Sequence, residues 1–502
     1  MDRRNFLKLL LGGGATIFLD RGYGQRLLNR GNRLERFALP PPVVNTFSTE
    51  ICLNSRRSYH SGYSGSLSDQ ILANVLWAAS KAPLMGSSRI IYVARSDNVY
   101  RYDPAQHDII LHLAGNHMSE SNLAFEVGIT GDFSEDAGTA LFFAKIASFS
   151  FWTSTTNQPS ACVKESGRSN AQANWNPTGT IHMVCCFGRM PTVSGMTSQL
   201  VAISSNGTLP NPTTNGTVLL ENALNNLKYG NQFLSTELTL QQISQIAYAS
   251  YGNTPHTSTN GRAALTVPSA VANYYLTARI YIVRSEGVER YHIRTPGGGN
   301  TTRDHRIERV KTGDRSPNLR YAVPRLPQTA PNYFVYCAAQ AANYQLQEAG
   351  YAGASALLQA SSMVPPLQGY FTANFTSSER TAIINALGIP SADLPLFIFS
   401  VGTPASLIEE GSSENRIHIK VSPNPFRDKT EIRLQIPDGE DQRQKVRLDI
   451  YDGAGRVVKS FAPAAVLIWD GKDNRGIPVA KGSYLCVLRI GRTEYRQRII
   501  KI

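Results

Sequence analysis

Hydrophobic residues recur at helical spacing in two stretches of this chain that closely resemble each other. Residues 67–78 (LSDQILANVLWA) and 238–249 (LTLQQISQIAYA) both open with Leu and a hydroxyl residue, then place apolar residues at helical spacing. This pattern predicts two amphipathic helices with hydroxyl N-caps. Residues 91–102 and 280–291 each predict a strand, a turn and a second strand, and seven of their twelve positions are identical. The chain therefore contains an internal repeat.

Two further pairs extend this repeat. Ala137-Gly138 and Ala349-Gly350 each precede an Ala-rich stretch that we expect to be helical, and residues 183–188 and 396–402 each predict a buried strand that ends in Gly. The order helix, hairpin, Ala-rich helix and final strand thus occurs twice. It predicts a layered α+β fold in two tandem repeats, over residues 50–210 and 215–403.

The period of hydrophobic positions changes to two in the last part of the chain. A polar, acidic stretch at 404–415 predicts a linker, and residues 416–502 predict six or seven short strands separated by turns. Many short strands in a segment of this length predict an all-β sandwich. The acids at 470–473 are better explained by a hairpin turn than by calcium, because Lys472 occupies a ligand position.

The N-terminal residues 1–36 combine basic charge with a short apolar run. Arg3 and Arg4 are followed by Asn-Phe-Leu-Lys and a mildly apolar stretch that is too short to span a bilayer comfortably. The segment resembles a twin-arginine export signal, which implies export by the twin-arginine machinery to the periplasm, the cell surface or the medium. That route carries proteins already folded, often with a cofactor bound.

Charge and cysteine content narrow the possible functions. The formal net charge is +13, but no run of five like charges occurs, so we expect no nucleic-acid binding. Six scattered cysteines do not form a disulfide framework. Cys185 and Cys186 lie near His182 without any CxxC or HxxxH spacing, so we expect a buried strand there and no metal site.

Several motifs in the repeats resemble the nitroreductase superfamily, most closely its SagB-type branch of flavin-dependent dehydrogenases. They are RRSYHSGY at 56–63, RAALTVPSAVANY at 262–274, the Glu348-Ala349-Gly350 helix start and the terminal Val401-Gly402. The resemblance implies FMN as cofactor. Because members are usually homodimers with FMN between subunits, it also implies that this tandem repeat is a pseudo-dimer within one chain.

The resemblance also implies candidate binding residues. Arg56, Arg57 and Ser58 would contact the phosphate and ribityl groups, although they could instead form a surface Arg pair at a strand start. Pro268, Ser269 and Ala270 would line the flavin ring, although this could be a turn with Ser269 as a helix N-cap.

Two more arginines, Arg189 and Arg262, are candidates for cofactor contacts, and the catalytic residues remain unassigned. Each repeat lacks the candidate cofactor-binding residues that the other repeat retains. Arg57 corresponds to Lys228 and Arg189 to Thr403, whereas the Pro-Ser-Ala loop has no counterpart at 83–88. We therefore expect one complete flavin site, assembled from both repeats.

The phrases SPNPF, IYDGAGRVV, WDGKDNRG and GSYLCVLRIG in the last segment resemble the Ig-like domain of flagellar hook-capping proteins and the sorting domain of type 9 secretion cargo. They imply a cell-surface or secretion-system partner for residues 416–502. The chain as a whole is expected to be an exported FMN-dependent oxidoreductase that transfers hydride to or from a small or peptide substrate, with an unknown electron donor. The alternative is a non-enzymatic exported binding or surface protein with a degenerate fold.

Overall fold

The computed structural model describes residues 35–201, 208–258, 260–405, 418–424, 426–435, 446–452, 455–462, 466–490 and 493–502. The chain divides into two compact units, Met1–Pro404 and Ala405–Ile502. The expected export segment at 1–36 and linker at 404–415 lie outside the described residues, apart from Glu35, Arg36, Pro404 and Ala405. None of the helices in the described ranges is long and apolar enough to cross a membrane.

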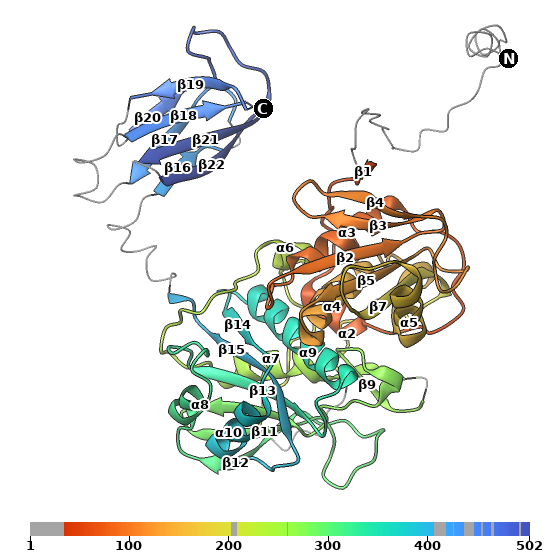
Figure 1. The fold of residues 1–502 in the computed structure, drawn as a ribbon. Coiled ribbons are helices and arrows are strands. Elements are labelled where there is room, and N and C mark those ends of the chain that lie inside the picture. Colours follow the sequence, from red (N-terminus) through yellow and green to blue (C-terminus); the bar gives the residue numbers. More distant parts are fainter. Residues whose placement is uncertain are drawn as a thin grey trace, which may run out of the picture. The chain divides into compact units, whose positions relative to one another are not determined.

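The first half of the first unit is built on a seven-stranded sheet, shown in orange to brown in Figure 1. Its strand order is β1-β4-β3-β2-β5-β7-β6, and all its neighbouring strands are antiparallel. The strands are β1 (Arg36–Ala38), β2 (Arg89–Ala94), β3 (Asn98–Asp103), β4 (Asp108–Ala114), β5 (Phe125–Gly131), β6 (Thr156–Lys164) and β7 (Ile181–Thr192). The helices are α2 (Thr49–Ser55), α3 (Asp69–Lys81), α4 (Ser134–Phe149) and α5 (Glu165–Asn174).

The second half contains a six-stranded sheet in the order β12-β11-β10-β13-β15-β14. Its strands are β10 (Ile280–Arg284), β11 (Gly287–His292), β12 (Arg306–Thr312), β13 (Asn332–Ala338), β14 (Gln368–Thr372) and β15 (Leu394–Gly402). The helices are α6 (Leu220–Asn225), α7 (Leu240–Tyr251), α8 (Ser316–Ala322), α9 (Asn343–Ser362) and α10 (Ser377–Leu387). A separate hairpin, β8 (Asn253–Thr257) with β9 (Ala263–Leu265), and a short 3₁₀ helix η1 (Ala270–Ala272) lie between α7 and β10.

The two sheets have the same strand order once β1 is set aside. In the predicted hairpins even the register agrees, since Tyr92 pairs with Arg101 and the corresponding Tyr281 pairs with the corresponding Arg290. The predicted helices also form, with Ser68 and Thr239 as their N-caps. The order of elements that the hydrophobic pattern predicted is therefore present in both halves.

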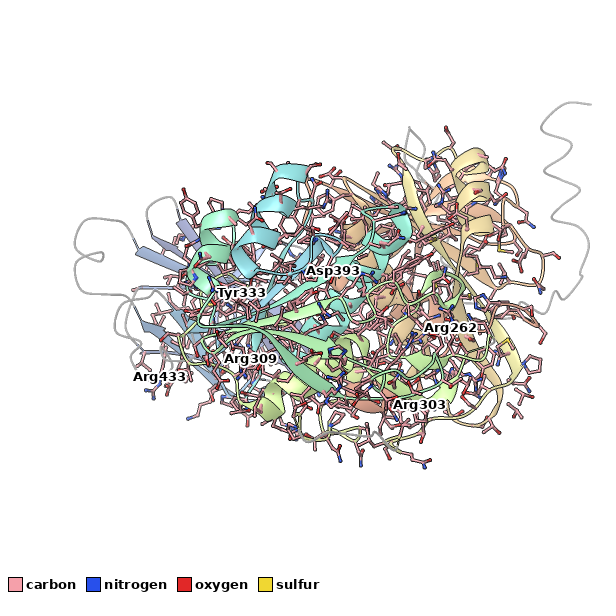
Figure 2. All side chains as sticks on the ribbon, turned by 90° about the horizontal axis from the view of Figure 1, so that it is seen from below. Arg262, Arg303, Arg309, Tyr333, Asp393 and Arg433 are labelled. Carbon is pink, nitrogen blue, oxygen red and sulfur yellow. The ribbon has the colours of Figure 1, made fainter. Side chains whose placement is uncertain are left out.

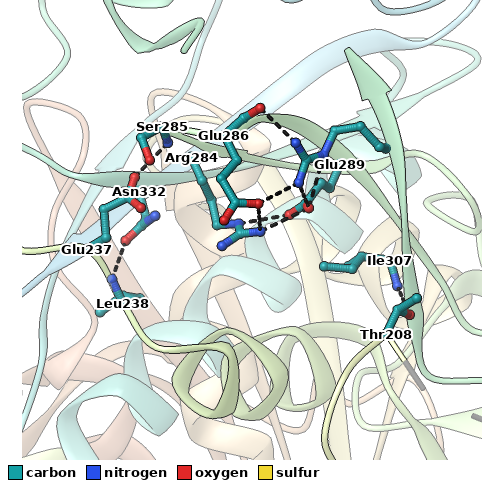
Figure 3. Close-up of polar contacts among 10 residues, drawn as sticks. Thr208, Glu237, Leu238, Arg284, Ser285, Glu286, Glu289, Ile307 and Asn332 are labelled. Carbon is teal, nitrogen blue, oxygen red and sulfur yellow. Dashed lines mark hydrogen bonds and ion pairs between the residues drawn. The ribbon is translucent and has the colours of Figure 1, made fainter. Parts of the chain in front are cut away.

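The hairpin of the second half is held by a group of charged side chains at its turn (Figure 3). Arg284 Nε donates to Glu289 at 2.8 Å, and Arg309 Nη2 donates to both Glu286 and Glu289 at 2.7 Å. Arg284 and Glu289 are almost fully buried, where solvent cannot stabilise their charges. Each charge is instead paired with the other. These residues are structural and close the turn where the first half has Asp97-Asn98.

The Ala-rich helices α4 and α9 pack directly against each other at the centre of the unit (Figure 1). All residues of α4 are buried, and small side chains allow the two backbones to approach closely. A Cβ atom at Gly138 would press on the backbone of Gln347, and one at Gly350 would press on the backbone of Glu135. The two contacts are reciprocal, because the sequence offset from Gly138 to Gly350 equals the offset from Glu135 to Gln347.

A second reciprocal contact joins the segments that lead into α2 and α6. Thr49 donates its N–H to the carbonyl of Val218, and Leu220 donates to the carbonyl of Phe47, both at 3.1 Å. The sequence offset between the two donors equals the offset between the two acceptors. The two halves therefore share one packed interior along these contacts.

The second unit consists of two antiparallel sheets around one core. One sheet contains β16 (His418–Ser422), β17 (Thr430–Gln435) and β20 (Val466–Trp469); the other contains β18 (Val446–Tyr451), β19 (Val457–Phe461), β21 (Gly482–Ile490) and β22 (Thr493–Lys501). Trp469 is fully buried between Phe426 and Tyr484, with ring centroids 5.2 and 5.1 Å away. Strand β20 consists of four consecutive apolar residues (VLIW), so it lacks the alternating pattern from which strands were predicted in this segment, and it was missed.

Candidate functional site

A cleft in the first unit consists of two adjoining cavities of about 380 and 510 Å³. Both cavities are lined by Ser58, His60, Pro268 and Ser269. The smaller one extends to Cys162–Ser166, where β6 meets α5, and to three residues of α9 (Tyr344, Gln347 and Tyr351). The larger one extends to Arg56, Arg57 and the β8–β9 hairpin. Cavities of this size are typical of small-molecule and cofactor sites.

The expected phosphate segment begins where α2 ends. Arg56 is the C-cap residue, and its extended backbone carries the chain out of the helix toward the cleft. Its guanidinium is buried and donates to the carbonyl of Leu265 at 2.6 Å and to Ser58 Oγ at 3.4 Å. Burial lowers the pKa of Arg56 to about 10. Arg57 is partly exposed, donates to the carbonyl of Thr257 at 3.4 Å and lies over the ring of Tyr59.

The expected ring-lining loop follows β9. Pro268, Ser269 and Ala270 all line the smaller cavity. Ser269 precedes η1 but does not cap it through its side chain; instead Ser269 Oγ accepts a hydrogen bond from the Tyr274 N–H at 2.8 Å. The residues of this loop come from the second half, whereas Arg56–Ser58 come from the first. The structure thus brings both predicted segments to one cleft.

Arg262, which is labelled in Figure 2, is absent from the residues that line the two cavities. Its Nη1 donates to the carbonyls of Ala272 and Asn273, at 2.9 and 3.0 Å. Ala272 and Tyr274 have φ values of 51° and 54°, in the left-handed region that non-glycine residues rarely adopt. Arg262 therefore stabilises a strained turn next to the cleft, while its own side chain does not line the cleft.

Arg189, the other expected arginine, is also absent from the lining of both cavities. It lies on β7 and donates to the carbonyls of Ser66 at 3.2 Å and Asn157 at 2.7 Å. Ser66 lies in the loop before α3 and Asn157 near the start of the edge strand β6, so the guanidinium joins this loop to the edge of the sheet.

Sequence reasoning missed a buried lysine next to the cleft. Lys145 on α4 is fully buried, and its Nζ donates to Ser58 Oγ at 3.1 Å and to the carbonyl of Ala161. Burial is the main cause that lowers the pKa of Lys145, to about 8. The only indication in the sequence was that Lys145 is the single charged residue in the Ala-rich stretch 139–148 of this helix.

Two histidines of the cleft were missed as well. His60 Nδ1 lies 3.1 Å from Cys162 Sγ, and partial burial together with Lys145 and Lys164 lowers the pKa of His60. His256 has its pKa lowered to about 2, first by burial and then by Arg56 and Arg57. Both imidazoles are therefore neutral at pH 7. The positive charge of the cleft comes from its lysine and arginine side chains.

Unpaired polar atoms in the cleft indicate where a ligand could bind. Arg56 Nε and the Tyr351 hydroxyl are buried and have no hydrogen-bond partner among the described residues. At the rim, Lys164 Nζ is 2.5 Å from Glu120 and is thereby neutralised. The region around Arg56 and Arg57 thus suits an anionic group, and the smaller cavity offers a mixed polar and apolar surface. Cys185 and Cys186 are buried free thiols on β7, and the described part of the chain contains no cluster of three or more metal-ligating side chains.

Comparison with known proteins identifies the fold. No family model and no curated protein matches the chain. A solved structure from Anabaena variabilis, provisionally assigned as a nitroreductase, aligns over 70% of this chain and 93% of its own length, with a TM-score of 0.50 and 11% identity. A similarly assigned structure from Ralstonia eutropha aligns over 41% of this chain and 96% of its own, with a TM-score of 0.31 and 22% identity. A third, from Desulfovibrio desulfuricans in complex with FMN, aligns over 39% and 91%, with a TM-score of 0.26 and 15% identity.

The Anabaena alignment covers more of the chain than either half of the first unit contains, so both halves contribute to the match. At this level of identity the likeness concerns the fold. The first unit of this chain has the α+β fold of the nitroreductases.

Proposed function

We propose that this protein is an FMN-dependent oxidoreductase with one flavin site per chain, in the cleft between the two halves of the first unit. The observation that carries the proposal is that Arg56–Ser58 from one half and Pro268–Ala270 from the other line the same cleft. The fit to FMN is supported by the unpaired Arg56 Nε, the nearby Arg57 and the absence of any carboxylate among the described residues that line the larger cavity. Cationic donors are the groups that bind a phosphate most strongly.

Bound FMN would supply the hydride chemistry, so no nucleophilic side chain is required. In the larger cavity, Arg56 and Arg57 would hold the phosphate. In the smaller cavity, Pro268, Ser269 and Ala270 would form one wall of the ring slot and exclude water from it. Arg262 and the Ser269 hydroxyl hold this wall by the hydrogen bonds described above.

The first unit is proposed to be a tandem repeat that forms a dimer within one chain. The identical strand order and the reciprocal contacts at Gly138 and Gly350 support this proposal. In a two-fold interface, residue i of one copy contacts residue j of the other, and j contacts i. The pairs Gly138–Gln347 and Gly350–Glu135 follow this rule.

A second site is not expected in the other half. At the sequence offset that relates α2 to α6, Ser58 corresponds to Tyr229. The Tyr229 ring stacks on that of Tyr370, with centroids 5.3 Å apart. On the opposite helix, the buried Asp136 is neutralised by Arg89 at 2.6 Å. Aromatic packing and a closed ion pair take the place of a serine and an open loop, so this half does not offer the same place for a flavin.

The substrate is proposed to be a small molecule or a peptide, as in the SagB-type branch, with an electron donor that is unknown. The chain is proposed to be exported through its twin-arginine segment. Its Ig-like second unit would then bind a cell-surface or secretion-system partner. Replacing Arg3 and Arg4 by Lys should retain the protein in the cytoplasm, because charge is kept but the guanidinium pair is lost. Normal export of that variant, measured by cell fractionation, would rule out this route.

Purification and flavin analysis test the main proposal. We expect a yellow protein that carries one FMN per chain, measured by absorbance against protein concentration. Two FMN per chain would contradict the single-site proposal. A colourless protein that binds no added FMN would favour the alternative, an exported binding or surface protein that keeps the fold without the cofactor.

A further inference from the structure

Lys145 is a buried cation without an acidic partner. It is 0% exposed, and no carboxylate among the described residues forms an ion pair with it. Among the described residues, its Nζ donates hydrogen bonds only to two neutral oxygens, Ser58 Oγ and the Ala161 carbonyl, and it lies over the Phe149 ring. Burial of an uncompensated charge is costly, so its presence beside a cleft indicates a functional role.

The hydrogen bonds around Ser58 fix the direction of its hydroxyl. Ser58 Oγ accepts from Lys145 Nζ at 3.1 Å and from Arg56 Nη1 at 3.4 Å. A hydroxyl oxygen has two lone pairs, and here both face cationic donors. The hydroxyl hydrogen is therefore left to donate. Because Ser58 lines both cavities, this donor faces the cleft.

The other half of the unit lacks this arrangement. Gly138 corresponds to Gly350, so Lys145 corresponds to Leu357, since each lies equally far along its helix from that glycine (145 minus 138, 357 minus 350). Ser58 corresponds to Tyr229 at the separate offset that relates α2 to α6. The lysine and the serine are thus both replaced in the half where Tyr229 stacks on Tyr370.

We propose that Lys145 is a positioning residue that keeps Ser58 as a hydrogen-bond donor to the cleft and, by its buried charge, favours the reduced form of the flavin. The inference rests on the proposed FMN site. Reduction by a hydride transfers two electrons and one proton from a reduced organic substrate, which leaves in its oxidised form. The flavin thereby gains one negative charge, which a fixed positive charge in a low-dielectric site stabilises. The phosphate charge is the same in both redox states, so an effect on phosphate binding alone would not change the potential.

The test is the midpoint reduction potential of the flavin-loaded protein, measured by dithionite titration with a reference dye. In Lys145→Met we expect at least a tenfold loss in the preference for reduced over oxidised FMN, which is about 30 mV toward lower potential for a two-electron couple. Lys145→Arg should retain most of the wild-type potential. Leu357→Met is the matched control at the corresponding position and should leave the potential unchanged.

An unchanged potential in flavin-loaded Lys145→Met would overturn the inference while leaving the proposed function intact. An equal fall in Leu357→Met would also overturn it, because the effect would then be general to helix packing. If wild-type protein binds no FMN, the proposed function fails and this inference fails with it.

A second measurement covers the case in which Lys145→Met loses its flavin. The potential of the wild-type protein should fall more steeply with pH from about pH 8, where Lys145 begins to lose its proton in the oxidised protein. The other titratable groups near Lys145 are Arg56, His60, Cys162, Cys185 and Cys186. The pKa of His60 is lowered and those of the three thiols are raised, so they do not account for this change. A constant slope from pH 7 to pH 9 would contradict the role of Lys145.

Discussion

Arg56 donates a hydrogen bond to the backbone carbonyl of Leu265 at 2.6 Å, although 209 residues separate the two. Arg56 ends the α2 helix of one half, and Leu265 ends the strand that precedes the Pro-Ser-Ala loop of the other. The bond is buried and charge-assisted, so it holds both walls of the cleft in place before any ligand binds.

Arg57→Ala should weaken FMN binding by about tenfold or more, because a charge-assisted hydrogen bond contributes roughly 1.5–3 kcal/mol. Lys228→Ala, the corresponding change in the other half, should leave the affinity unchanged. Fluorescence titration with FMN measures both. Equal losses would show that both halves bind flavin.

Arg262→Ala should release the turn at Ala272 and Asn273, whose two carbonyls lose their donor. We expect FMN to dissociate several-fold faster, because the loop wall is no longer fixed. Arg189→Ala removes an arginine that bonds the carbonyls of Ser66 and Asn157, neither of which lines the cleft, and it serves as the control. Stopped-flow displacement of FMN measures both rates. Faster dissociation from Arg189→Ala would show that the contacts of Arg189 reach the cofactor.

Ionisation of Glu348 should lower the free energy of unfolding of the first unit as the pH rises toward about 7. This residue is buried on α9 beneath the loop, accepts hydrogen bonds from Tyr251 and Leu276, and burial raises its pKa to about 7. In the unfolded chain the pKa is about 4.3. Between these values the folded state holds a proton that the unfolded state has lost, so the unfolding free energy falls with pH, by at most about 1.4 kcal/mol per unit.

The variant Glu348→Gln keeps an acceptor oxygen but cannot ionise. Its melting temperature relative to wild type should therefore rise between pH 5 and pH 7 and stay level above about pH 7. Thermal unfolding at a series of pH values measures this difference. A difference that does not change with pH would show that Glu348 does not titrate in this range.

Gly350→Ala should destabilise the helix crossing, even though Ala favours a helix over Gly by about 1 kcal/mol. The added methyl would meet the backbone of Glu135, which cannot move aside, and overpacking costs roughly 1–3 kcal/mol. Gly167→Ala on α5 is the control, because its methyl would meet the ends of side chains. Differential scanning calorimetry should show a lower melting temperature for Gly350→Ala alone.

The hydrophobic pattern predicted the repeated order of elements because strands and helices with one buried face have distinct periods. The resemblance of these motifs to the nitroreductases, together with their survival in only one half each, predicted that Arg56–Ser58 and Pro268–Ala270 complement each other. The pattern could not place Arg189 and Arg262. Their guanidinium groups bond backbone carbonyls, three of them in loops and turns and one in β6, and such contacts depend on a backbone conformation that the sequence does not specify.

Lys145 was missed for a related reason. Sequence spacing assigns it to a buried helix face, where a lysine looks like an exception, and only the three-dimensional packing places Ser58 above it. The pair His60 and Cys162 lies 102 residues apart and meets through the same packing. Residues that act through long-range contacts carry no local pattern.

The stacked pair Tyr229 and Tyr370 has a consequence for how the two halves can change. In a dimer of identical chains, every substitution appears at both clefts, so a mutation that closes one closes the other. In the dimer within one chain that we propose, each half is encoded separately, so Tyr229 can pack against Tyr370 in one half while Ser58 stays beside the cleft in the other. Substitutions in the half without the proposed flavin site can then improve the packing of the whole unit without changing the cleft.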